Sequence, residues 1–314
     1  MSPRPEIWDN PNIAMVSSNP SSFPEEVMSR LRRRQWHISL KTSQVSEAFK
    51  AFNEAKCSIL LIHDTPALPA SFILRAQIAD PVATLTPTMV VCHPAHSQDL
   101  ALLKEIGIPE LVGSSINPAA FIGGFEYLIR RWSSGTLRHV FQARRHLLNR
   151  QFLPFSKLMT SLKADADLQP LVTPCTAQIL MRQTDFKSVE SLLLDALKEH
   201  PRNIGIIANL VEFYLRAAMP ETALKLLAAA RKNHGSPRIL CADQVQAHLM
   251  LNQVHACIPL LEELIKEDYC RQQAEEFLAR CLFAEGYTER FQRLVAHETP
   301  VVDDFKLRWN KTAS

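Results

Sequence analysis

Apolar residues in the first 132 positions fall into short runs separated by amphipathic stretches. Five apolar runs predict strands: 13–16, 37–40, 58–62, 88–91 and 110–112. Five stretches with helical spacing predict helices: 23–35, 45–55, 72–78, 98–106 and 118–132. The run 58–62 (SILLI) is apolar throughout, as expected of a strand covered on both faces. A strand and a helix repeated five times predict a parallel sheet with helices on both faces.

The second half of the chain repeats its apolar pattern every 34 residues. Val189, Ala223, Cys257 and Phe291 form one series of small or apolar residues at this spacing. A second series, which comes from the preceding helix of each unit, is Leu180, Tyr214, His248 and Leu282. A fixed period of this length predicts stacked helical pairs, because one pair is too thin to bury its own apolar face.

The composition of the 314 residues is that of an ordinary globular protein: 46% hydrophobic, 21% charged and a net charge of +3. The seven cysteines are scattered and form no CxxC pair, so we expect buried thiols and neither disulfides nor zinc. No apolar core of a signal peptide and no run of about 18 apolar residues is present. We therefore expect a cytoplasmic protein without a membrane span.

The repeated pattern resembles the tetratricopeptide repeat family over roughly residues 172–297. The best-matching unit, 204–237, has Tyr214 in its first helix and a small residue, Ala223, in its second, but no unit has the family's early tryptophan or glycine. The resemblance implies a concave, protein-binding groove lined by the first helix of each pair. The candidate groove residues are Asn209, Glu212, Arg216, Gln246 and Arg280.

The first 132 residues are similar to the receiver domain of bacterial response regulators. The resemblance rests on Ser17-Ser18-Asn19-Pro20, the strand ending in His63-Asp64, the strand ending before Cys92, and the segment 107–118. It implies a flavodoxin-like sheet and a pocket in which a magnesium ion and a lysine neutralise a phosphorylated aspartate.

This sequence departs from the receiver pattern at the positions that carry the chemistry. Ser17 and Ser18 replace the acidic pair, Cys92 replaces the hydroxyl residue, and Ser114 replaces the lysine. His63 or Asp64 holds the acceptor position, and the spacing leaves both open. We therefore predict a degenerate receiver with no metal and no cofactor, in which Asp64 is at most a vestigial phosphoacceptor.

A basic connector joins the two halves. No Asp or Glu occurs between Tyr127 and Ala164, and apolar residues recur there at helical spacing. We favour two roles for this connector. It is either a helix that packs the two domains against each other while its arginines are solvated, or a helix that mediates dimerisation. Binding to nucleic acid is a weaker alternative, because aromatic residues are not interleaved with the basic ones.

These patterns predict a receiver-like domain at 10–132, a helical connector at 133–168, tetratricopeptide-like repeats at 169–297 and a tail at 298–314. We expect a non-enzymatic adaptor that binds proteins in a bacterial signalling or localisation pathway, with a homodimer through the receiver-like domain or the connector as a further option. The alternatives are a response regulator phosphorylated on Asp64 that controls the array, and a nucleic-acid-binding regulator that uses the connector.

Overall fold

The computed structural model describes residues 11–19, 23–94, 96, 104–105, 109–113, 117–234 and 238–296. Within it the chain forms two compact units, 1–213 and 214–314. The limits 133–168 and 169–297 drawn from the sequence stay predictions. The predicted helix 98–106 lies outside the described residues except for Lys104 and Glu105, which are helical.

The first unit contains a five-stranded parallel sheet, which confirms the predicted fold class of this region. The strands are Asn12–Val16 (β1), His37–Thr42 (β2), Ile59–His63 (β3), Thr88–Val91 (β4) and Glu110–Val112 (β5). Their order is β2-β1-β3-β4-β5, the flavodoxin-like arrangement. Every residue of β4, and residues 59–62 of β3, are buried, whereas exposure alternates along the edge strand β2. The uniformly apolar run 58–62 therefore correctly predicted a strand that is covered on both faces.

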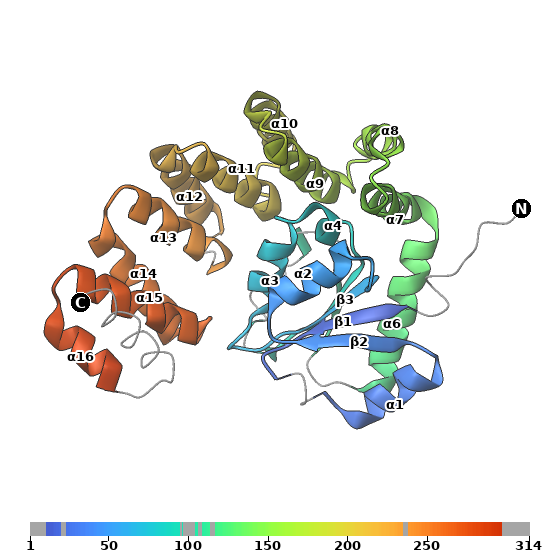
Figure 1. Ribbon diagram of the computed structural model, residues 1–314, viewed down its shortest axis with the longest axis horizontal. Coiled ribbons are helices and arrows are strands. Elements are labelled where there is room, and N and C mark those ends of the chain that lie inside the picture. Colours follow the sequence, from blue (N-terminus) through green and yellow to red (C-terminus); the bar gives the residue numbers. More distant parts are fainter. Residues whose placement is uncertain are drawn as a thin grey trace, which may run out of the picture. The chain divides into compact units, whose positions relative to one another are not determined.

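Helices cover both faces of this sheet (Figure 1). One face carries Glu25–Arg33 (α1) and Pro118–Ser133 (α6), which contact each other, and the other carries Val45–Asn53 (α2), Ala70–Gln77 (α3) and Pro81–Thr84 (α4). Gly124 allows α6 to approach the sheet, because a Cβ there would lie 3.1 Å from Val112 Cγ2.

The basic connector belongs to the same core as the sheet. It forms Gly135–Leu148 (α7) and Phe152–Leu162 (α8), followed by Gln169–Arg182 (α9) and Phe186–Glu199 (α10). Apolar residues of α7, α8 and α9, among them Val140, Met159 and Cys175, join one hydrophobic cluster with the strands. Helix α9 is fixed to α4 by an ion pair from Arg182 Nη2 to Asp80 Oδ2 (3.2 Å). The helical half therefore begins as an extension of the α/β layer.

The helical region continues through Ile204–Arg216 (α11), and the second unit begins near the end of this helix. A series of antiparallel helices follows. These are Pro220–His234 (α12), Cys241–Met250 (α13), Val254–Lys266 (α14), Arg271–Ala284 (α15) and Thr288–Ala296 (α16). In the second unit each helix from α12 to α16 contacts the next in sequence. Their core uses the predicted periodic positions, including Ala223, Leu227 and Cys257.

The 34-residue period is also present in the backbone. The second helix of each pair begins at residue 186, 220, 254 or 288, at intervals of 34. The turn before it has a left-handed residue at the same spacing: Thr184, Ala218, Asn252 and Gly286, with φ between 56° and 74°. The following N–H bonds back to the first helix, as from Met219 N to Tyr214 O (2.8 Å) and Tyr287 N to Leu282 O (2.9 Å). These are Schellman turns, in which a left-handed residue ends the helix and satisfies its last carbonyls.

Ala218 and Gly286 hold equivalent turns, and so they provide a matched test of this geometry. A left-handed alanine is strained by its Cβ, so we expect Ala218→Gly to raise the free energy of unfolding of the second unit by about 1 kcal/mol and Gly286→Ala to lower it by a similar amount. Urea unfolding followed by far-UV circular dichroism measures both. Ala229→Gly, inside α12, makes the same chemical change with the opposite expected sign. Equal effects of Ala218→Gly and Ala229→Gly would contradict the turn assignment.

Candidate functional site

The carboxyl edge of the sheet carries several of the residues that the sequence analysis predicted for a receiver-like pocket. The strand register pairs Val16 with Ile62 and Val91 with His63, so β1, β3 and β4 end side by side. Ser17 Oγ lies 3.1 Å from His63 Nδ1, and Ser18 Oγ lies 2.8 Å from Thr65 Oγ1. The structure therefore places His63 against Ser17, and which of His63 and Asp64 corresponds to the acceptor of the receiver pattern stays a prediction.

Asp64 is a buried carboxylate whose two oxygens are both engaged. Its side chain is 1% exposed. Oδ1 accepts hydrogen bonds from the backbone N–H of Ala70 (2.8 Å) and from Nδ1 of His96 (2.8 Å), while Oδ2 accepts one from the backbone N–H of His93 (2.9 Å). These donors come from the start of α3 and from the segment after β4. Asp64 thus ties two connections to the end of β3, which is a structural role.

Cys92 follows β4 and is also buried. Burial, followed by the charge of Asp64, raises the pKa of the Cys92 thiol to about 11, so this thiol is protonated near neutral pH. A buried thiol of this kind is a poor nucleophile and only a weak hydrogen-bond donor. Ser114, the fourth position of the degenerate pocket, lies outside the described residues.

The titratable groups at this edge do not assemble into a metal site. In the part of the chain that the structure describes, no three His, Cys, Asp or Glu side chains come close enough to hold an ion. The rings of His93 and His96 are 5.5 Å apart, but His96 is committed to Asp64.

The candidate groove residues separate into two groups. Asn209 is 0% exposed: its Oδ1 accepts a hydrogen bond from Gln178 Nε2 (3.0 Å), and its Nδ2 donates to Gly205 O (3.0 Å). Glu212 accepts from the same Gln178 amide (3.1 Å) and forms an ion pair with Arg75 of α3 (3.2 Å). Asn209 is therefore a core residue of the first unit instead of an exposed contact, and Glu212 is committed largely to contacts within that unit.

Arg216, Gln246 and Arg280 belong to the second unit and are exposed. Arg280 forms an ion pair with Glu276 of its own helix and stacks over Phe277 at 5.5 Å. Their role in partner binding stays a prediction.

Sequence reasoning missed Gln178, although the period contains the signal. Gln178, Glu212, Gln246 and Arg280 are successive residues at intervals of 34, so they hold one repeat position. The contact between Gln178 and Glu212 joins equivalent positions of α9 and α11, as expected where neighbouring repeats stack. Gln178 could therefore have been predicted as the residue equivalent to Glu212 in the preceding repeat.

Arg144 corrects the expectation that the connector arginines are solvated. Its side chain is 2% exposed, and burial lowers its pKa to about 10. The guanidinium donates to Thr86 Oγ1 (3.0 Å) and Cys57 O (2.9 Å) and lies over the ring of Phe141. Arg144 thus fixes α7 to the α/β layer, whereas Arg138, Arg145 and Arg150 are exposed.

All seven cysteines are buried free thiols, as the sequence indicated. Among the described helices, none combines the length and apolarity required to cross a bilayer. A scan against family models, a search of curated proteins and a search of solved structures each return no match.

The hydrogen bonds of Asp64 predict a large effect on stability. Asp64→Asn places an amide N–H₂ where donors already converge, so we expect the free energy of unfolding of the first unit to fall by about 3 kcal/mol. Urea unfolding followed by tryptophan fluorescence measures it, since Trp36 and Trp132 are buried in this unit. The exposed Asp167→Asn is the matched control, and an equally small effect of both changes would show that Asp64 has no structural role.

His63 predicts a dependence of stability on pH. Burial lowers the pKa of His63, the nearby His93 adds to this, and the charge of Asp64 opposes it. Because the unfolded chain then binds the proton more readily, this contribution to stability is complete at pH 7.5 and is lost as the pH falls below about 6.5. Between pH 7.5 and 5.5 the midpoint of urea unfolding is expected to decrease less in His63→Gln than in the unmodified protein. The exposed His139→Gln is expected to show the same decrease as the unmodified protein. An unchanged slope in His63→Gln would refute the assignment.

Proposed function

We propose that this protein is a non-catalytic adaptor: a pseudo-receiver that acts without phosphorylation, joined to a tetratricopeptide-like array that binds a protein partner in a bacterial signalling or localisation pathway. The observation that carries the proposal is the run of four turns at intervals of 34 residues, each with a left-handed residue before the second helix of a pair. Arrays of such pairs usually present an extended binding surface.

The engagement of Asp64 supports the part of the proposal that concerns phosphorylation. A phosphorylated carboxylate needs a divalent cation and a basic side chain to neutralise it. Here Ser17 and Ser18 stand in place of the acidic pair of the receiver pattern, and three hydrogen bonds from Ala70, His93 and His96 already occupy the Asp64 carboxylate. An Asp64 phospho-switch, the alternative, would have to break those bonds before phosphate could be accepted.

Affinity capture from host lysate with the full chain tests this function. We expect a specific protein to be retained, and Arg280→Glu to abolish its retention, because charge reversal at the shared repeat position changes the predicted binding surface. Arg293→Glu on α16 is the matched control, since Arg293, like Arg280, pairs with a Glu four residues earlier on its own helix.

The same capture with acetyl phosphate and Mg²⁺ separates the adaptor from the phospho-switch. We expect identical capture and no phosphate on Asp64 by mass spectrometry. Capture that requires acetyl phosphate, with Asp64 modified, would establish the alternative. Capture that Arg280→Glu retains as fully as Arg293→Glu would remove Arg280 from the binding surface.

A further inference from the structure

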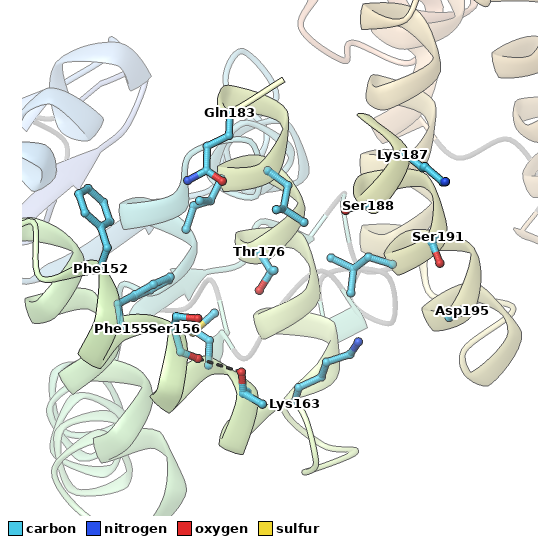
Figure 2. A pocket seen from close by; sticks show the side chains of 15 residues that line it. Phe152, Phe155, Ser156, Lys163, Thr176, Gln183, Lys187, Ser188, Ser191 and Asp195 are labelled. Carbon is cyan, nitrogen blue, oxygen red and sulfur yellow. Dashed lines mark hydrogen bonds between the residues drawn. The ribbon is translucent and has the colours of Figure 1, made fainter. Parts of the chain in front are cut away.

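Three successive helices of the first unit enclose a groove of about 680 Å³ (Figure 2). Helix α9 contacts both α8 and α10 and forms the floor, while α8 and α10 form the walls. The residues of α8 that line the groove include Phe152, Phe155 and Met159, and Lys163 directly after the helix continues the same helical spacing along one face. Arg216, Gln246 and Arg280 belong to the second unit and are not among the residues that line this groove.

The interior of the groove is apolar. Phe155 and Met159 are buried, and Ile179 packs against the core of the unit. Two threonines contribute little polarity, because Thr160 donates to Ser156 O (3.0 Å) and Thr176 donates to Val172 O (2.9 Å) within their own helices. A ligand that enters the groove would therefore meet apolar side chains on α8 and α9. The polar side chains of the lining lie mainly at the end of α9 and on α10: Gln183, Lys187, Ser188, Ser191 and Asp195.

Large apolar side chains stand exposed at the start of α8. Phe152, which lines the groove, is 59% exposed, and its neighbour Leu153 is 68% exposed. These are the two highest values among the exposed large hydrophobic residues of the described chain. Aromatic and aliphatic residues left in water beside a groove are typical anchors of a binding surface.

Helices α7 and α8 and the residues that directly follow them carry exposed basic side chains, of which Lys163 lines the groove. Arg138, Arg145, Arg150, Lys157 and Lys163 are exposed, and no Asp or Glu lies between Tyr127 and Ala164. Within the described chain, none of the five has a carboxylate at ion-pair distance, whereas Arg30, Arg32 and Arg34 on and after α1 are all paired. Asp195 on the opposite wall is bonded to Lys198 (2.8 Å) and also interacts electrostatically with Lys163. Because Lys163 and Lys187 both line the groove beside this one carboxylate, the charge of the lining is positive on balance.

We propose that this groove binds an acidic amphipathic helix of a partner protein. The apolar face of the helix enters between α8 and α10, and its Glu or Asp residues face Lys163 and Lys187, which line the groove. The stripe from Phe152 to Lys163 is about 16 Å long at 1.5 Å per residue, which accommodates about three helical turns. The proposal shares with the proposed function only the premise that the chain binds proteins.

A displayed library of 14-residue peptides tests this site. Each peptide carries Leu at helical spacing on one face, and each remaining position is either Glu or Lys. Selection on the full-length protein is expected to enrich Glu over Lys, and the double variant Lys157→Glu, Lys163→Glu is expected to shift the preference towards Lys. No enrichment, or equal use of Glu and Lys, would overturn the proposal.

Two matched serines on α8 locate the binding. Both Ser156 and Ser161 are exposed, but only Ser156 lines the groove. We expect Ser156→Glu to weaken the affinity of a selected peptide by about ten-fold in fluorescence anisotropy, and Ser161→Glu to leave it nearly unchanged. Equal affinities of the two variants would place the peptide elsewhere and overturn the proposal.

Self-association is the competing occupant. If sedimentation shows that the full-length protein is a dimer and that Ser156→Glu alone makes it a monomer, the groove is filled by a second copy and the proposal fails. None of these outcomes changes the expected effect of Arg280→Glu on partner capture. The groove hypothesis and the proposed adaptor function can therefore fail independently of each other.

Discussion

A pair of helices cannot bury its own apolar face, and this constraint organises the helical half of the protein. The first pair solves it by packing on the α/β layer, where Cys175 of α9 reaches Pro81 O (3.5 Å) and Arg182 pairs with Asp80. The sheet and its helices thus act as the cap that such arrays need at one end. This explains why the connector and the first pair belong to the same compact unit as the sheet. Removal of the α/β layer would expose the apolar side of α9.

Buried polar contacts set the relative register of the elements in this unit. Gln178 bridges Asn209 and Glu212, and Arg75 joins Glu212 to α3. Each of these groups would be costly to bury alone, so alternative packings of α9 and α11 that separate them are disfavoured. Arg144 fixes the position of α7 in the same way, because its guanidinium can donate hydrogen bonds to Thr86 and Cys57 only in this arrangement. Apolar burial supplies the driving force, and these contacts select one arrangement.

The sequence predicted the elements better than the site because the two depend on different kinds of information. Strands such as 58–62 and the 34-residue helical pairs appear as local periodicity, and the structure places them within a few residues of the predicted positions. The role of Asp64 depends on Ala70, His93 and His96, none of which is its neighbour along the chain. The burial of Asn209 likewise depends on Gln178, 31 residues earlier. Hydrogen bonds of this kind leave no local trace in the sequence, except where they join equivalent repeat positions, as those of Gln178 and Glu212 do.

The sheet edge also limits how this molecule could transmit a signal. In a switch, a carboxylate at the end of a central strand must change its charge and its contacts when it is modified. Asp64 is instead a fixed acceptor that holds the start of α3 and the segment after β4, and any change at this residue breaks buried hydrogen bonds. The hydrogen bonds of Asp64 therefore favour a single arrangement of this edge. If the protein is the adaptor that we propose, the α/β layer that packs against helix α9 holds the binding surface in one shape, and regulation acts through the availability of the partner.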